Sequence, residues 1–311
     1  MTATFAMRDW ESMFGTWAQP PGRGEQQRCD NAERAVRNAI AGSGKLNTRD
    51  IRVFLQGSYR NNVNVRQESD VDLGILCRDT FYFDLPDGMS RDQFGLNTPA
   101  TYDFALFKNE VGAALVDHFG AAAVTRGDKA FDVRANSYRV DADVAPFFEY
   151  RWYAGANLRH DGVRLESDTG KVIVNWPEQH YANGVAKNEA TGRAFKGVVR
   201  ILKRLCIEMS GEGIAAAIAA CPGFLIECLT YNVPNDRFSY STWRQVIREV
   251  LAFLFNNTLD DARCANWHEV SELKWLFRPT RYGVHTTTTQ KWTRQQAHAF
   301  VDSAWNYLGL Q

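Results

Sequence analysis

The 311-residue sequence predicts an α+β fold built in two parts. In the first 150 residues, short segments in which apolar and polar residues alternate are separated by segments with helical spacing of apolar residues. From residue 151 on, nearly every periodic segment has helical spacing. Strands and helices that separate along the chain in this way are typical of α+β proteins. We therefore expect one domain at residues 1–150 and a second at residues 151–311.

The first part is expected to hold two helices and three strands. Apolar residues recur three and four positions apart in a helix facing a core, and every second position in a strand with one buried face. The helices are predicted at residues 25–41 and 109–119, and the strands at residues 50–56, 70–76 and 138–144, the last of them closed by Pro146.

The second part is expected to be mostly helical. A hairpin-like stretch at residues 163–174 leads to the tripeptide Asn175-Trp176-Pro177. Helical spacing then predicts four helices, at residues 192–209, 223–232, 241–255 and 293–308.

The composition excludes several classes of protein. Hydrophobic residues make up 45% and charged residues 23%, which is typical of a folded globular chain and not of a disordered one. The 36 basic and 36 acidic side chains balance, whereas proteins that coat nucleic acids usually have a basic excess. No run approaches the roughly 18 apolar residues of a membrane span, and the six cysteines form no C-x-x-C pair. We expect a cytoplasmic monomer that needs neither a membrane nor a nucleic-acid polymer as partner.

Paired carboxylates on two predicted strands point to a metal site. Asp70 and Asp72 are two positions apart on one strand, and Asp141 and Asp143 repeat the arrangement on another, so each pair shares one face. Several like charges in a partly desolvated site repel one another unless a cation is bound. Mg²⁺ prefers carboxylate oxygens, and two such ions can clamp an in-line phosphoryl displacement. The alternative is a sheet with one face in water, and an isolated D-x-D also occurs in sugar transferases.

A glycine-serine turn precedes the first carboxylate pair. Gly57 and Ser58 end the predicted strand at residues 50–56, where backbone N–H groups and a hydroxyl suit a polyphosphate. Together with Asp70 and Asp72 a few residues later, they form one composite motif for a metal-bound phosphate.

This motif resembles the signature of a known family. The run LQGSYRNNVNVR from Leu55 to Arg66, followed by Ser69-Asp70-Val71-Asp72, is similar to polymerase-β-like nucleotidyltransferases. Within that superfamily it most resembles the cGAS/DncV-like enzymes of bacterial anti-phage defence, and among these the pyrimidine-using clade E. Further similar segments, spread over residues 52–234, are Asp143-Val144-Ala145-Pro146, Asn175-Trp176-Pro177 and Glu227 to Pro234.

The resemblance implies a catalytic core of mixed sheet and helices joined to a mostly helical lobe like that of oligoadenylate synthases and poly(A) polymerases, with an N-terminal helix able to span both. It implies that Asp70 and Asp72 hold two Mg²⁺ ions, for which Mn²⁺ can substitute. Asp143 would complete the metal site and help activate the acceptor 3′-hydroxyl, with Asp141 as its neighbour on the same face.

The nucleotide-binding residues follow from the same resemblance. Gln56, Gly57 and Ser58 would contact the donor triphosphate. Lys203 would contact its phosphates, with Lys196 one to two turns earlier on the same basic stripe of a helix; the alternative for this stripe is a solvated basic face.

Two further positions bear on the base. Where relatives often have Ser-Tyr, this chain has Gly223-Phe224, so Phe224 can still stack on a base but Gly223 supplies no hydroxyl. Asn175 would favour uracil over a purine, since an amide can both donate and accept; the alternative is an asparagine that starts a turn before Pro177.

The activity implied is synthesis of a 3′,3′-linked, uracil-containing cyclic dinucleotide, either cyclic di-UMP or cyclic UMP-AMP, from UTP and ATP. The product would be the signal of anti-phage (CBASS) defence, sensed by an effector that this protein does not contact directly. The alternatives are a nucleotidyltransferase that acts on RNA, a small molecule or a protein, and a nucleotide-binding pseudoenzyme scaffold.

Overall fold

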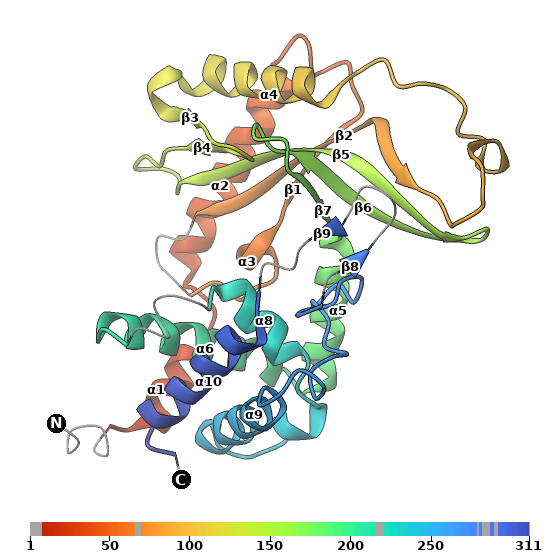
Figure 1. Ribbon diagram of the computed structural model, residues 1–311. Helices are drawn as coiled ribbons and strands as arrows, with labels where there is room; N and C mark the ends of the chain where they lie inside the picture. Colours follow the sequence, from red (N-terminus) through yellow and green to blue (C-terminus); the bar gives the residue numbers. More distant parts are fainter. Residues whose placement is uncertain are drawn as a thin grey trace.

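A seven-stranded mixed sheet and a group of helices beneath it make up the molecule (Figure 1). The computed structural model describes residues 8–65, 70–214, 221–278, 280–281, 287–288 and 292–310. Within these residues no helix combines the length and the apolar character that crossing a bilayer requires. The fold is α+β, as predicted from the sequence.

The sheet has the strand order β1-β2-β5-β4-β3, and β6 pairs with β5 and with β7. Its strands are β1 (Ile51–Leu55), β2 (Val71–Asp84), β3 (Val124–Arg126), β4 (Phe131–Val133), β5 (Ala142–Gly155), β6 (Leu158–Glu166) and β7 (Val172–Asn175). The two long strands β2 and β5 run parallel, and the other pairs are antiparallel. A short antiparallel pair, β8 (Thr280–Arg281) and β9 (Thr287–Thr288), lies outside this sheet.

Two helices, α2 (Arg23–Ala41) and α4 (Phe104–Phe119), pack against the sheet. Their apolar residues, such as Val36 and Phe107, are buried against strand residues such as Leu73 and Val144. One hydrophobic cluster therefore joins these helices to the strands that carry the predicted carboxylates.

The predicted end of the third strand at Pro146 is wrong. The strand begins at Ala142 and continues through Pro146, which lies opposite Ile75, as far as Gly155. On its other side β5 pairs with β4 only up to Val144 and with β6 only from Phe148. Pro146 lies between these two ladders, so its missing N–H interrupts neither.

The predicted domain boundary between residues 150 and 151 falls within β5, and two further strands follow in the same sheet. The sequence pattern thus changes at Arg151, but the pairing of the strands does not. The passage from sheet to helices comes after Asn175, where β7 ends and α5 begins at Pro177.

The remaining long helices gather on the other side of the molecule around a second core (Figure 1). They are α1 (Trp10–Trp17), α6 (Ala194–Gly211), α8 (Gly223–Tyr231), α9 (Trp243–Asn257) and α10 (Arg294–Tyr307), while α5 (Pro177–Ala190) packs against α6 without adding to this core. The N-terminal helix α1 belongs to this core through Trp10 and Phe14, although α2 packs on the sheet. Val63, in the loop after the short helix α3 (Gly57–Arg60), is also buried in it.

Candidate active site

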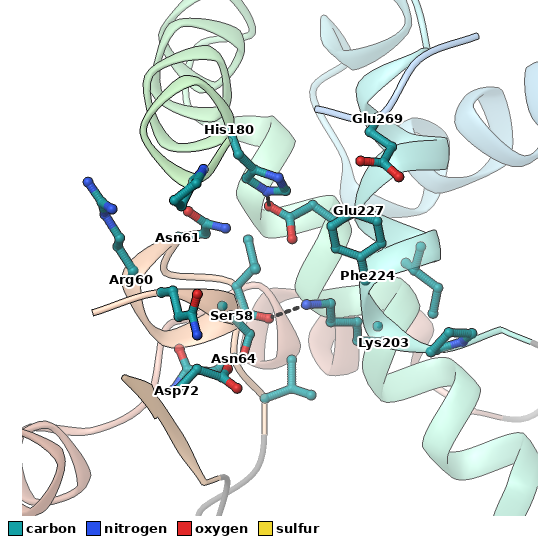
Figure 2. A pocket seen from close by; sticks show the side chains of 18 of the residues that line it. Ser58, Arg60, Asn61, Asn64, Asp72, His180, Lys203, Phe224, Glu227 and Glu269 are labelled. Carbon is teal, nitrogen blue, oxygen red and sulfur yellow. Dashed lines mark hydrogen bonds and ion pairs between the residues drawn. The ribbon is translucent and has the colours of Figure 1, made fainter. Parts of the chain in front are cut away.

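A cavity of about 670 Å³ lies where the sheet meets the helices (Figure 2). It is lined by Gln56 just after β1, by α3 and its following loop, by the start of β2, by the end of β7, by α5, α6 and α8, and by Glu269 and Ser271. The predicted site residues among its lining are Gln56, Gly57, Ser58, Asp72, Asn175, Lys203 and Phe224. Arg66 and Ser69 of the predicted motif lie outside the described residues.

The glycine-serine segment forms the start of α3 and lies directly against Asp72. Gly57 has a φ of 66°, a left-handed conformation that favours glycine. A Cβ at this position would lie 1.8 Å from Oδ2 of Asp72. The backbone N–H of Gln56 donates to the carbonyl oxygen of Asp72 at 2.9 Å. The end of β1 is therefore held beside the Asp72 carboxylate, with Ser58 next to it on the cavity wall.

Carboxylates from three neighbouring strands meet in one row of the sheet. Asp72 on β2 lies opposite Asp143 on β5, and Asp143 lies opposite Asp132 on β4. Asp70 directly precedes β2 and is exposed. Asp132 was missed in the sequence analysis, although Phe131-Asp132-Val133 has the apolar-acidic-apolar alternation of the other two strands.

Burial and the neighbouring negative charges raise the pKa values of three of these carboxylates. Burial raises the pKa of Asp72 to about 6, with a further rise from the charge of Asp70 and an opposing effect of the Lys203 ammonium. Burial also raises the pKa of Asp143 to about 7, helped by a hydrogen bond with Asp132 and by the charge of Asp72. The pKa of Asp70 is raised as well, first by burial. The site is thus short of positive charge.

Asp141 does not share a strand face with Asp143. It lies before the first residue of β5 and is exposed, and its carboxylate accepts a hydrogen bond from the backbone N–H of Ala135. Because the strand begins only at Ala142, Asp141 lies just outside it, where, after burial, its charge still raises the pKa of Asp70.

The carboxylate row fits a divalent cation that arrives with a nucleotide. Its donor set consists of the carboxylate oxygens that Mg²⁺ prefers, and a cation would offset the burial and the neighbouring negative charges that raise the pKa of Asp72 and Asp143. In the described part of the chain, no three His, Cys, Asp or Glu side chains are arranged to hold a metal unaided. Mg²⁺ often takes one or two protein carboxylates and completes its shell with water and substrate phosphates.

The basic stripe of α6 is largely buried. Lys203 is 7% exposed, and its ammonium donates to the carbonyl oxygen of Val63 at 3.1 Å. Arg200 donates to the carbonyl oxygens of Asn62 and Ala18. Burial lowers the pKa of both Lys203 and Arg200. The stripe therefore positions the loop after α3, and Lys203 also faces the cavity.

Lys196 lies apart from this arrangement. It is absent from the described cavity lining, and its ammonium lies 5.8 Å from the centroid of the Tyr181 ring. Burial lowers its pKa. A phosphate contact by Lys196 stays a prediction.

The Gly223-Phe224 pair begins α8 at the cavity wall. A Cβ on Gly223 would lie 3.0 Å from Cε of Lys203, so glycine at this position leaves room for the lysine side chain. Phe224 is 38% exposed and lies 5.8 Å from His180 between ring centroids. Its ring is thus available in the cavity for stacking.

A buried ion pair at the cavity was also missed in the sequence analysis. Nε2 of His180 and Oε1 of Glu227 are 3.0 Å apart, and both residues are buried (Figure 2). The charges of His180 and of Lys203 lower the pKa of Glu227 against the effect of its burial. Glu227 lies in a segment similar to the family, but an isolated glutamate gives no sequence signal for this pairing.

Asn175 ends β7 and lines the cavity from an exposed position. Its Oδ1 accepts a hydrogen bond from Nζ of Lys274 at 3.0 Å. The amide NH₂ and the second lone pair of Oδ1 therefore remain for a ligand.

Comparison with known proteins agrees with this geometry. Residues 182–309 match the family model of the cGAS/DncV-like nucleotidyltransferase C-terminal helical domain. Two cyclic dipyrimidine nucleotide synthases CdnE are similar over 96% of this chain and 98% of their own: that of Cecembia lonarensis at 39% identity and that of Legionella pneumophila at 41%. The solved structure of the Rhodothermus marinus CdnE c-UMP-AMP synthase with Apcpp and Upnpp has a TM-score of 0.80 at 26% identity, covering 96% of this chain and 97% of that chain.

Near-complete coverage at about 40% identity reaches both lobes and the cavity between them. The family typically uses divalent metals, in keeping with the carboxylate row, and takes nucleoside triphosphates as substrates. The chain therefore belongs to the CdnE clade of the cGAS/DncV-like nucleotidyltransferases and is an enzyme of the cyclic dinucleotide synthase type.

Proposed function

We propose that this enzyme makes a 3′,3′-linked cyclic dinucleotide that contains uracil, either cyclic di-UMP or cyclic UMP-AMP, as a signal in anti-phage defence. The observation that carries the proposal is the cavity, which has Asp72, Ser58 and Lys203 near one another (Figure 2) and Asn175 in its wall. The similarity to two dipyrimidine synthases and to a c-UMP-AMP synthase supports uracil as one of the bases.

The chain's own residues would act by positioning. Ser58 and Lys203 hold the donor phosphates, and Phe224 offers an aromatic face to a base, a contact worth about 1–3 kcal/mol in comparable sites. Divalent cations bound by Asp70, Asp72 and Asp143 would supply charge neutralisation at the phosphates. Positioning and charge stabilisation account for most of the catalysis in such phosphoryl transfers.

Each of two similar steps forms one bond and breaks one. The acceptor O3′ bonds to the α-phosphorus of the donor, the bond from that phosphorus to the β-phosphate oxygen breaks, and pyrophosphate leaves. We assign Asp143 to help remove the hydroxyl proton, because it lies beside Asp72 in the carboxylate row. The linear product then turns round, and its own 3′-hydroxyl closes the ring in the second step.

Product identification tests the proposal. The full-length enzyme is incubated with Mg²⁺ and each NTP alone and in pairs, and products are identified by mass spectrometry and nuclease digestion. We expect a cyclic product whenever UTP is present. A purine-only cyclic product would overturn the uracil assignment, and a nucleotide attached to RNA or protein in place of any cyclic product would overturn the cyclisation. Asp143→Asn should reduce turnover at least about 100-fold, the usual range for loss of a general base.

A further inference from the structure

Glu269 is a buried residue at the cavity whose carboxyl group has no hydrogen-bond partner among the described residues. It is 8% exposed and lines the cavity together with Ser271. None of the hydrogen bonds within the described residues involves its carboxyl oxygens, although its backbone N–H donates to Lys274. Buried polar groups normally have a partner, so a carboxyl that faces a cavity without one indicates a ligand there.

Glu269 lies away from the phosphate-binding end. In Figure 2 it is separated from Lys203 and Asp72, with Phe224 drawn between Glu269 and Lys203. A nucleotide whose phosphates contact Lys203 and whose base stacks on Phe224 would direct the edge of the base toward Glu269.

The polar groups at this end form a donor and an acceptor. Oδ1 of Asn175 already accepts one hydrogen bond, from Lys274, and the amide NH₂ can act as a donor. The Glu269 carboxyl keeps an acceptor oxygen whether or not it carries a proton. The charge of Lys274 also acts on Glu269, opposing the rise in pKa that burial causes. One lysine thus lies close to both groups.

This pair matches one edge of uracil. Uracil has the acceptor O4 next to the donor N3–H, whereas cytosine has the donor N4–H₂ next to the acceptor N3. Adenine has the same order as cytosine, and guanine has the order of uracil on a larger ring.

We infer that Glu269 is a base-recognition residue whose carboxyl accepts the N3–H hydrogen bond of uracil, while the Asn175 amide donates to O4. This inference rests on the proposed uracil-containing product. It assigns to Glu269 selectivity among nucleotides and no part in the chemical step.

Nucleotide binding by three variants tests the inference without turnover. Affinities for α,β-non-hydrolysable analogues of UTP, CTP, ATP and GTP are measured by calorimetry with Mg²⁺. Glu269→Met keeps the volume and removes the acceptor, and Glu269→Gln keeps an acceptor oxygen. Glu272→Gln is the matched control, because Glu272 accepts from the Tyr231 hydroxyl and does not line the cavity. Thermal unfolding of each variant reports on its folding.

We expect Glu269→Met to weaken binding of the uridine analogue roughly tenfold, which is the usual effect of losing one hydrogen bond to a charged group. Affinity for the adenosine analogue should stay within about twofold, since adenine has the acceptor N1 where uracil has the donor N3–H. Glu269→Gln should bind the uridine analogue nearly as well as the wild type. If the folded Glu269→Met variant binds all four analogues equally more weakly, or binds the uridine analogue as well as the wild type does, the inference is overturned. Product analysis of the wild type tests the proposed function separately. If the wild type makes no uracil-containing product, the proposed function fails, whatever the binding measurements on the variants show.

Discussion

Replacing Asp72 by Asn is expected to stabilise the metal-free protein while abolishing its activity. The pKa of Asp72 is raised from 3.8 to about 6 in the folded state, chiefly by burial. A carboxyl whose pKa is higher when folded binds more protons in the folded than in the unfolded protein between these two values. Stability is therefore lost as the pH rises through this window, and the full cost is present above about pH 6.

The size of this cost follows from the same pKa. The rise from 3.8 to about 6 corresponds to about 3 kcal/mol at pH 8, since one pKa unit is worth about 1.4 kcal/mol. Asn has nearly the same shape and no charge, so Asp72→Asn removes most of this cost. At roughly 2 °C per kcal/mol for a chain of this size, the melting temperature should rise by about 6 °C. At pH 5, inside the window, the difference should be about half as large.

Thermal and urea unfolding in EDTA at pH 5 and pH 8 measure the effect, with Asp87→Asn on an exposed loop as control. Adding Mg²⁺ with a non-hydrolysable nucleotide should stabilise the wild type and have much less effect on Asp72→Asn. A variant that is less stable than the wild type at pH 8 without metal would refute the electrostatic reasoning. Equal stabilisation of both proteins by Mg²⁺-nucleotide would refute the assignment of Asp72 as a metal ligand.

Three further changes test the surroundings of Asp72. Gly57→Ala should lower stability by at least about 1–2 kcal/mol because of its left-handed φ, and should reduce product formation because its Cβ would meet the Asp72 carboxylate; normal product formation would contradict the close approach. Lys203→Met should weaken nucleotide binding by at least about tenfold through loss of a charged contact to phosphate, and unchanged binding would remove Lys203 from the site. Gly223→Ser should change the unfolding free energy by less than about 1 kcal/mol, since only the end of the Lys203 side chain must move by a few tenths of an ångström; a larger loss, measured by urea unfolding, would show that the lysine cannot move.

Much of the catalytic core could be predicted because its signals are local. Alternation of apolar and acidic residues places Asp72 on a strand, and Gly57 marks a tight backbone position a few residues earlier. The predicted end at Pro146 failed because proline is compatible with a strand wherever no ladder runs on its N–H side. That condition depends on where β4 and β6 end, which no local pattern contains.

The side-chain contacts of the helical part were harder to predict from the sequence. The basic stripe of α6 predicts charge on one face, but whether that face meets water, phosphate or protein depends on what packs against it. In the structure Arg200 and Lys203 bind backbone carbonyls from the loop after α3. Because every residue type has the same backbone carbonyl, the sequence does not show which carbonyl will accept such a hydrogen bond.

By itself, the sequence determined the α+β class, the family and the local chemistry of each strand and turn, because periodicity and short motifs are properties of neighbouring residues. The tertiary structure alone decided which of these groups meet. It placed Asp132 beside Asp143, left Asp141 outside the strand that carries Asp143 and turned Glu269 toward a cavity shared with Gly57. Strand register and the packing of distant helices set these distances, and both depend on the whole hydrophobic core.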